Sequence, residues 1–336
     1  MPEPVRVALI GCGGIATANL RAYAALPELA RVVVACDSNA ERARRRAEGT
    51  GAEACLNYEE ALAWDDVEAV DLCLPHDLHE PVACAAAAAG KHVLVEKPIA
   101  RSLVEADRMI AACAAAGVHL MVAHCQRFSA DRQTAKRLVD EGAIGRIYLM
   151  RTDHNQWVEY PPGHWINDPA KLGGGGIAGS GVHHLDTLRW FCGDVARVSA
   201  GLTRSGLTAR TAEDGGVVLL EHAGGAVSEL ALSWTTPRFP WYESFWIYGT
   251  EGVIHNVGGL QMFRGAARAG QFEPVPTDHD DAGGFREEIR HFLTCVRTGE
   301  RPRMPGEEAR AALELVLAAY RSAEREEKVA LPLGVG

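Results

Sequence analysis

Apolar residues in the first 125 positions form short runs, and the segments between these runs have the spacing of amphipathic helices. The runs are rich in valine, leucine and cysteine, which is typical of strands buried on both faces of a parallel sheet. They predict strands at 5–10, 31–36, 67–74, 92–96 and 118–123. The intervening segments predict helices at 15–26, 40–48, 78–89 and 103–116. This alternation indicates right-handed strand–helix–strand units and a doubly wound parallel sheet.

After about residue 125 the pattern changes, because strand-like runs follow one another with few helices between them. Short turns between consecutive strands favour an antiparallel sheet. The predicted strands lie at 146–154, 195–203, 216–221, 226–233, 244–248 and 252–256. The predicted helices lie at 131–141, 182–191, 285–298 and 306–326. We therefore predict two domains, an α/β domain over residues 1–124 and an α+β domain over residues 125–336.

The composition is that of an ordinary globular protein. Of the 336 residues, 47% are apolar and 23% are charged, which excludes a disordered or collagen-like chain. The net charge of −10 and the lack of a basic stripe argue against nucleic acid as a partner. No long uninterrupted apolar run predicts a membrane span, and residues 1–11 lack the features of a signal peptide.

The cysteines indicate the compartment. There are nine, scattered along the chain and without a C-x-x-C pair. Several lie inside strand-like apolar runs, where a free thiol behaves as a small hydrophobic group. A disulfide framework is therefore not expected, and we predict a protein of the reducing cytoplasm.

The strongest local motif is a G-x-G-x-x-A sequence at residues 11–16, between a predicted strand and a predicted helix. Its first glycine permits a tight turn, its second lets a pyrophosphate approach the backbone, and its alanine allows close helix packing. The helix N-terminus that follows favours phosphate charge. The motif predicts a dinucleotide-binding loop formed by Gly11, Gly13, Gly14, Ile15 and Ala16.

Asp37 follows the second predicted strand, where a carboxylate can accept hydrogen bonds from the hydroxyls of the adenosine ribose. A carboxylate at this position repels the 2′-phosphate of NADP, so the sequence favours NAD as the cofactor. The neighbouring Arg42 leaves NADP as the less favoured alternative.

Glu96, Lys97 and Pro98 stand at the C-terminal end of another predicted strand, the edge of an open α/β sheet where ligands bind. Lysine is rare in this chain, since only positions 91, 97, 136, 171 and 328 carry it among 34 basic residues. A lysine kept at a strand end in a chain that otherwise uses arginine indicates that its ammonium group is needed. A solvated surface charge is the alternative interpretation.

These motifs resemble those of the glucose–fructose oxidoreductase/inositol dehydrogenase (Gfo/Idh/MocA) family, and the resemblance covers nearly the whole chain. Its most specific part is the Glu-Lys-Pro phrase within GKHVLVEKP at residues 90–98. The other matching segments are the glycine fingerprint, LPH at 74–76 with His79, Arg127-Phe128, GAIG at 142–145, the glycine tract before His183, GTEG at 249–252 and the C-terminal helices.

The resemblance implies an N-terminal Rossmann domain and a C-terminal domain with a large open sheet, which in relatives often forms the oligomer interface. It also implies NAD(P)-dependent oxidation or reduction of a sugar, a polyol or a related compound. Lys97 matches the catalytic lysine of the family. The residues that it assigns to the cofactor, beyond the glycine loop and Asp37, are Leu74, Pro75, His79, Glu96, Lys97 and Arg127.

The second catalytic motif departs from the family pattern. Many relatives carry an aspartate, a histidine four residues later and a second aspartate three residues beyond it. Here His183 and Asp186 match, but Gly179 occupies the place of the first aspartate. We predict that the hydroxyl proton leaves to His183 or Lys97, with the larger part of this role on His183, since imidazole suits it near neutral pH, and that Asp186 orients the His183 ring. Because these two side chains lack a third ligand, no metal is predicted.

The substrate is expected to contact Lys97 and His183, with His184 as a wall of the site. Trp157 and Trp165, in the loop before the glycine tract, offer aromatic faces that suit a sugar ring. Packing of this loop, or contact with a second subunit, is an equal alternative for the two aromatic residues.

The sequence therefore predicts an NAD-dependent dehydrogenase that moves a hydride between a sugar or polyol carbon and nicotinamide. Two alternatives stay open: a glycoside hydrolase or lyase that oxidises its sugar transiently on bound NAD, and a non-catalytic sensor of a dinucleotide or sugar. The intact Glu-Lys-Pro phrase and His183 argue against the sensor, because a sensor needs no base. A homodimer or homotetramer is expected, with the apolar runs 217–220 and 230–234 covering the open sheet.

Overall fold

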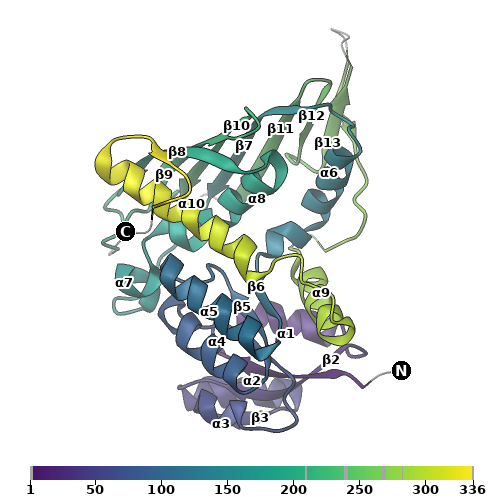
Figure 1. Ribbon diagram of the computed structural model, residues 1–336, viewed down its shortest axis with the longest axis vertical. Helices are drawn as coiled ribbons and strands as arrows, with labels where there is room; N and C mark the ends of the chain where they lie inside the picture. Colours follow the sequence, from purple (N-terminus) through teal and green to yellow (C-terminus); the bar gives the residue numbers. More distant parts are fainter. Residues whose placement is uncertain (1–2, 209, 238–240, 266–269, 282, 335–336) are drawn as a thin grey trace. The chain divides into compact units, whose positions relative to one another are not determined.

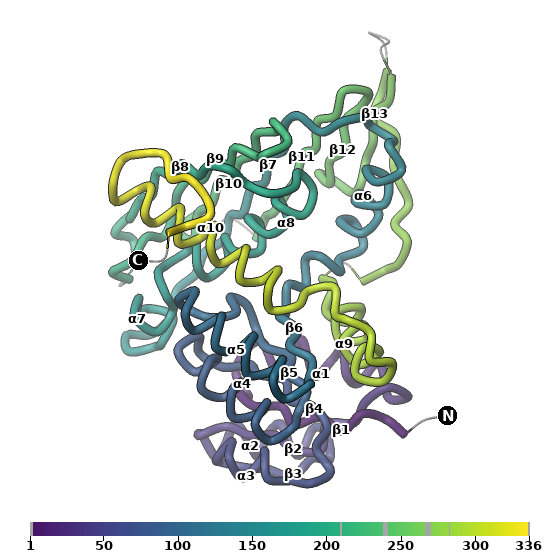
Figure 2. The backbone as a smooth tube through the Cα atoms, viewed as in Figure 1, coloured from purple at the N-terminus to yellow at the C-terminus, as the bar shows by residue number. Residues whose placement is uncertain are grey.

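The computed structural model describes residues 3–208, 210–237, 241–265, 270–281 and 283–334, and the chain forms two compact units (Figures 1 and 2). The first unit comprises Met1–Phe128 and Gly283–Arg310, and the second comprises Ser129–Ala282 and Ala311–Gly336. The first change of unit lies close to the predicted domain boundary after residue 124. The segment Gly283–Arg310, expected in the second domain, lies in the first unit.

The first unit is built on six parallel strands in the order β3-β2-β1-β4-β5-β6. The strands are β1 (Val5–Ile10), β2 (Ala30–Cys36), β3 (Glu53–Cys55), β4 (Ala69–Leu72), β5 (His92–Glu96) and β6 (Leu120–Ala123). This is the strand order of the Rossmann fold, with its point of reversal between β1 and β4. The predicted doubly wound parallel sheet is confirmed, and ligands of such sheets bind at the C-terminal ends of the strands.

The helices of the first unit connect these strands. They are α1 (Ala16–Ala24), α2 (Ala40–Thr50), α3 (Tyr58–Leu62), α4 (His79–Ala88), α5 (Leu103–Ala116) and α9 (Phe285–Thr298). In Figure 1, α4 and α5 lie side by side. Helix α9 packs beside α1 and buries Ile289, Phe292 and Leu293, which explains why its segment belongs to this unit.

The second unit is built on a sheet of nine strands in the order β14-β13-β12-β11-β7-β10-β9-β8-β15. Its strands are β7 (Ile147–Asn155), β8 (Val195–Thr203), β9 (Gly215–His222), β10 (Val227–Ser233), β11 (Tyr242–Gly249), β12 (Gly252–His255), β13 (Gln261–Arg264), β14 (Glu273–Pro274) and β15 (Val329–Ala330). Only β7 and β10 run parallel among the neighbouring strands of the described residues. The predicted mostly antiparallel sheet is confirmed.

Helices cover one face of this sheet (Figure 1). They are α6 (Ala130–Asp140), α8 (Val182–Cys192) and the part of α10 (Gly306–Arg325) from Ala311 onward, and a short α7 (Pro169–Leu172) precedes the glycine tract. Leu230 and Phe245 of the sheet pack in one core with Leu185 of α8 and Val316 of α10. Within the described ranges, no helix combines the length and the apolar composition that crossing a membrane requires.

The two apolar runs expected to cover the open sheet are divided between its faces. Side chains alternate along a strand, so every second residue of these runs points into the core of the unit. The inward residues are Val218, Leu220, Leu230, Leu232 and Trp234. Val217, Leu219 and Ala231 alternate with them on the outer face, where Val217 is 48% exposed. The outer face is therefore less apolar than the runs 217–220 and 230–234 suggest.

Candidate active site

The glycine loop between β1 and α1 has the conformation that a dinucleotide-binding turn requires. Gly11 has a φ of +97°. A Cβ atom there would lie 2.2 Å from the backbone oxygen of Cys73, the residue after β4, so only glycine fits. A Cβ atom on Gly13 or Gly14 would meet no atom within 4 Å, which leaves their backbone open to an approaching phosphate. Ile15 is the N-cap of α1, and Ala16 begins the helix, so the loop ends in a helix N-terminus.

Asp37 follows β2, and backbone donors hold its carboxylate beside the glycine loop. Its Oδ2 accepts a hydrogen bond from the backbone N–H of Cys12 at 2.9 Å, and its Oδ1 accepts one from the N–H of Asn39 at 2.8 Å. This is the position at which the sequence predicts a contact with the adenosine ribose. Arg42 is exposed in the first turn of α2, and its backbone N–H donates to the Asn39 side chain.

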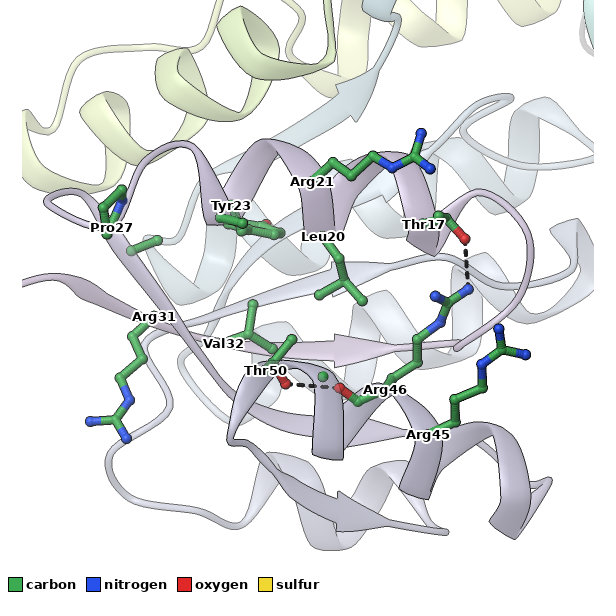
Figure 3. A pocket seen from close by; sticks show the side chains of 13 residues that line it. Thr17, Leu20, Arg21, Tyr23, Pro27, Arg31, Val32, Arg45, Arg46 and Thr50 are labelled. Atoms are coloured by element: carbon green, nitrogen blue, oxygen red, sulfur yellow. Dashed lines mark hydrogen bonds between the residues drawn. The ribbon is translucent and has the colours of Figure 1, made fainter.

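Arg46 of α2 is a contact of the glycine loop that the sequence motif does not reveal. Its Nη2 donates to the carbonyl oxygen of Gly13 at 3.0 Å and to Oγ1 of Thr17 at 2.6 Å. Figure 3 shows the bond to Thr17 at the edge of a pocket that Leu20 and Val32 also line. Arg46 thereby fastens α2 to the loop that would hold the pyrophosphate.

His79 connects the segments that follow β4 and β5. Its ring is completely buried, with Nδ1 at 2.9 Å from the carbonyl oxygen of Pro98 and Nε2 at 3.0 Å from that of Leu74. Burial lowers the pKa of His79, although the hydrogen bonds to these carbonyl oxygens act in the opposite sense. The ring therefore holds the Leu74-Pro75 segment and the Lys97-Pro98 segment in place at the C-terminal edge of the sheet.

Lys97 follows β5 directly, and its side chain is partly exposed. The preceding Glu96 is buried, and burial raises the pKa of its carboxyl to about 7 against the opposing charge of Lys97. Arg127, in the short 3₁₀ helix after β6, is 7% exposed and pairs with Glu308 at 3.1 Å. All residues predicted for the cofactor thus lie in the first unit.

In the second unit, two polar side chains hold the glycine tract that leads to α8. Oε1 of Glu213 accepts the backbone N–H groups of Gly175 at 3.1 Å and Ile177 at 2.9 Å. The hydroxyl of Tyr320 donates to the same oxygen at 2.8 Å. A Cβ atom on Gly175 would lie 2.0 Å from the backbone oxygen of Glu213, so the tract approaches its anchor this closely because it lacks a side chain.

Gly179 lies in a π-helix (Ile177–Gly181) before α8, and no side chain fits at this position. A Cβ atom there would lie 2.2 Å from Cη2 of Trp234, whose indole ring occupies the space. Trp234 is buried, and its Nε1 donates to Oγ of Ser180 at 2.9 Å. The guanidinium group of Arg210 lies 4.6 Å from the centre of the ring. Where the family pattern has an aspartate, this chain therefore has an aromatic wall.

His183 and Asp186 lie in the first turns of α8. The side chain of His183 is partly exposed, and Asp186 is 1% exposed. Position 183 is one helical turn after position 179, so the residue that carries the predicted base and the residue that faces Trp234 share one side of the helical segment.

His184 is completely buried and lies beside His154 of β7 and Glu243 of β11. Burial lowers the pKa of His184 well below its usual value, and the neighbouring His154 acts in the same sense. Of the residues predicted to contact the substrate, His184 has the smallest exposed fraction, since the other side chains are partly or largely exposed.

The loop before the glycine tract presents one of its two predicted aromatic contacts to solvent. Trp157 is 39% exposed, and its Nε1 donates to Oε2 of Glu159 at 3.1 Å. Trp165 is partly buried and packs against the core of the unit. Tyr160 stacks on His164 with ring centres 4.2 Å apart, so the loop is ordered by its own aromatic residues.

The chain is similar to known oxidoreductases along nearly its whole length. Residues 5–124 match the model of an oxidoreductase family with an NAD-binding Rossmann fold, and residues 132–255 match the GFO/IDH/MocA C-terminal domain. D-apiose dehydrogenase of Paraburkholderia graminis is 30% identical over 96% of this chain and 89% of its own length. D-xylose 1-dehydrogenase (NADP(+)) 2 of Haloferax volcanii is 30% identical over 80% of this chain and 82% of its own.

A solved structure of levoglucosan dehydrogenase, in complex with NADH and levoglucosan, shares this architecture. It matches with a TM-score of 0.90 at 26% identity, over 98% of this chain and 100% of that chain.

Proposed function

Because the chain belongs to the Gfo/Idh/MocA family of NAD(P)-dependent oxidoreductases, we propose that it is an NAD-dependent dehydrogenase of a sugar or polyol. The observation that carries the proposal is the open glycine loop joined to the Asp37 carboxylate through the N–H of Cys12. Bound nicotinamide supplies the hydride chemistry at its C4 atom. The protein positions the substrate hydroxyl and takes its proton.

The choice of NAD over NADP rests on Asp37. Two backbone N–H groups fix its carboxylate next to the loop, where a 2′-phosphate would meet a negative charge. The relatives use both cofactors, since the levoglucosan dehydrogenase structure holds NADH and the Haloferax enzyme is named for NADP+. The local charge at Asp37 is therefore the feature that favours NAD in this chain.

We assign the general base to His183, assisted by Lys97. The family pattern places an aspartate at position 179, but here Trp234 fills that space and offers no proton acceptor. His183 is partly exposed one turn further on, and neutral imidazole accepts a proton near pH 7. Asp186, buried on the same helix, acts as a positioning residue for this ring.

A carbohydrate or polyol substrate fits the aromatic residues of the second unit. The exposed face of Trp157 suits the C–H face of a sugar ring, and Trp165 supports the same loop from the core side. The relatives named above act on apiose, xylose and levoglucosan, which supports this class without selecting one member.

The proposal is tested by incubating the protein with NAD and a panel of aldoses, inositols, anhydrosugars and glycosides, while recording NADH absorbance and product identity. Net NADH with an oxidised product supports the dehydrogenase. Glycoside cleavage without net NADH overturns it in favour of transient oxidation on bound NAD. NAD binding without turnover of any compound overturns it in favour of a sensor.

The proposal extends to assembly and compartment. We expect a homodimer or homotetramer formed through the outer face of the nine-stranded sheet, where Val217 is exposed. All nine cysteines are free, and the buried ones among them are packed as small apolar groups, which suits the reducing cytoplasm.

A further inference from the structure

The second unit contains a buried cluster of His154, His184 and Glu243, which the proposed hydride transfer does not use. Strands β7 and β11 are paired with His154 directly opposite Glu243, and helix α8, which packs on β7, adds His184. One nitrogen or carboxylate oxygen from each residue lies within 4.8 Å of the other two. Three elements of the unit thus bring their ligand-type atoms to one point.

The two histidines lack the hydrogen bonds that buried imidazoles normally make. His154 is 4% exposed and His184 is 0% exposed, yet neither ring nitrogen of either residue has a hydrogen-bond partner in the described part of the chain. Most buried polar side-chain atoms in folded proteins have a partner, so four orphaned nitrogens around one carboxylate require an explanation.

Glu243 is oriented as a metal-binding carboxylate would be. Its Oε2 lies 3.8 Å from Nδ1 of His154 and 3.9 Å from Nε2 of His184, too far for hydrogen bonds. Its other oxygen, Oε1, accepts a hydrogen bond from Nη2 of Arg132 at 3.3 Å. One oxygen is therefore held by a charged neighbour while the other faces both imidazoles, the arrangement in which an outer partner orients a ligand.

We propose that His154, His184 and Glu243 bind a divalent transition-metal ion, with Zn²⁺ as the expected occupant. Two imidazoles and a carboxylate form a common zinc ligand set, with bonds of about 2.0–2.2 Å. Ligand atoms around tetrahedral zinc are about 3.3–3.6 Å apart at these bond lengths. The observed separations of 3.8 and 3.9 Å from Glu243 are slightly wider, and all three ligand atoms lie within 4.8 Å of one another, so side-chain rotation has to accompany binding.

The positive charge of Arg132 does not prevent binding of a cation. Nη1 of Arg132 lies 3.6 Å from Oδ1 of Asp131, so two carboxylates share its charge. The charges of Glu243, Asp131 and Arg132 sum to one net negative charge when the two imidazoles are neutral. The cluster shares only His184 with the residues predicted for cofactor, substrate or base, and His184 is completely buried.

The test uses the full chain, expressed without a polyhistidine tag and freed of metal with a chelator. Dialysis against ZnCl₂ followed by elemental analysis should give one zinc ion per chain. Substitution with CoCl₂ should give the visible absorption of four-coordinate Co²⁺ with nitrogen and oxygen ligands. Folded protein that retains no stoichiometric zinc overturns the proposal.

Variants locate the ion. Glu243→Gln and His154→Gln should each weaken zinc affinity at least tenfold, since each removes one of three ligands. His222→Gln is the matched control: His222 is also buried in this unit, but its ring nitrogens are bonded to the Gly193 carbonyl and the Ser228 hydroxyl. The control should bind zinc as the unaltered protein does. Unchanged affinity in both cluster variants overturns the proposal.

A measurement on the unaltered protein covers the case in which a variant does not fold. X-ray absorption of the zinc-loaded chain should show two imidazoles and oxygen ligands at about 2.0–2.2 Å. Sulfur ligands would place the ion on the free cysteines instead, and fewer than two imidazoles would place it on the surface. Either result overturns the proposal.

Discussion

Trp234 fills the space in which a side chain at position 179 would stand. Its ring is fixed by the hydrogen bond to Ser180 and by the guanidinium group of Arg210 on its face. An indole ring cannot take up a proton, so Trp234 does not replace the aspartate of the family pattern as a proton acceptor. Our proposal gives this role to His183, which is partly exposed in the first turn of α8, whereas the neighbouring His184 is buried.

Placing the family's aspartate at position 179 should therefore lower the stability of the protein, unless Trp234 is replaced by a smaller residue at the same time. Gly179→Asp alone places its Cβ 2.2 Å from the indole, and overpacking of this kind costs about 1–3 kcal/mol of unfolding free energy. In combination with Trp234→Ala the clash disappears, so the two changes should show a favourable coupling of at least about 1 kcal/mol. Urea unfolding of the four proteins measures it. Additive effects would show that the ring moves aside freely.

The assignment of the base predicts the kinetics of two variants. His183→Ala and Lys97→Ala should each lower turnover by about 10²–10⁴-fold, because loss of a general acid–base group has this effect on the chemical step. Circular dichroism should be unchanged in both variants, since neither residue belongs to the core, and NAD binding should be unchanged in His183→Ala. Turnover within tenfold of normal in His183→Ala, measured with the identified substrate, would remove His183 from the mechanism.

The Asp37 carboxylate predicts a preference for NAD over NADP, which a binding measurement without any substrate can test. NAD should bind at least roughly tenfold tighter than NADP, because a like charge opposite the 2′-phosphate is costly. Asp37→Asn removes the charge but keeps an oxygen that can accept from one of the two N–H groups, so it should narrow this gap. Calorimetric titration gives both dissociation constants. Equal affinities in the unaltered protein would contradict the argument.

Elements with a clear period were predictable, and short or irregular ones were not. Strands β1 and β5 and helices α5 and α9 begin and end where their apolar patterns predict. Strand β3 and helix α3 span only three and five residues, which is too short for a period to show. The π-helix at Ile177–Gly181 has no sequence signal of its own, because its path depends on Glu213 and Tyr320, distant in the chain.

Asp71 in strand β4 should make the stability of the protein depend on pH. Asp71 is 0% exposed in this strand and accepts from Nδ2 of Asn19 at 3.0 Å. Burial raises the pKa of Asp71 from 3.8 to about 6, and hydrogen bonds lower it only in part. The folded state therefore keeps a proton that the unfolded chain loses, so this group makes the protein less stable as pH rises from about 4 to 6.

Asp71→Asn should remove this dependence while keeping an oxygen for Asn19. The variant should match the unaltered protein near pH 4 and exceed it at pH 7 by up to roughly 3 kcal/mol of unfolding free energy. Urea midpoints at pH 4, 5, 6 and 7 test this, and the difference between the two proteins cancels the other titrating groups. A difference that does not change with pH would show that folding does not raise the pKa of Asp71.

At the scale of the whole molecule, the residues predicted for the site belong to both units. The glycine loop, Asp37 and Lys97 lie in the first unit, whereas His183, Asp186 and the aromatic loop lie in the second. The motifs identified these residues because each stands at a strand end or helix start that chain order reveals. Trp234 and the His154–Glu243 pair were not identified, because their roles depend on register and packing between distant strands.

The outer face of the nine-stranded sheet should be the surface through which copies of the chain associate. Val217 is 48% exposed, and Leu219 and Ala231 lie on the same face as Val217. Exposed apolar groups on one sheet face are best covered by a second copy of the chain. Light scattering should therefore show a dimer or tetramer.

Val217→Lys places a charge in this face and should shift the equilibrium towards smaller species, with an unchanged circular dichroism spectrum. Glu273→Lys, on the exposed two-residue strand β14, is the control and should leave the mass unchanged. The ion pairs of Arg151 with Glu229 and of Arg197 with Glu221 are exposed on neighbouring strands, so high salt alone should affect assembly little if the apolar residues hold it. A monomer at all concentrations would mean that this face needs no partner.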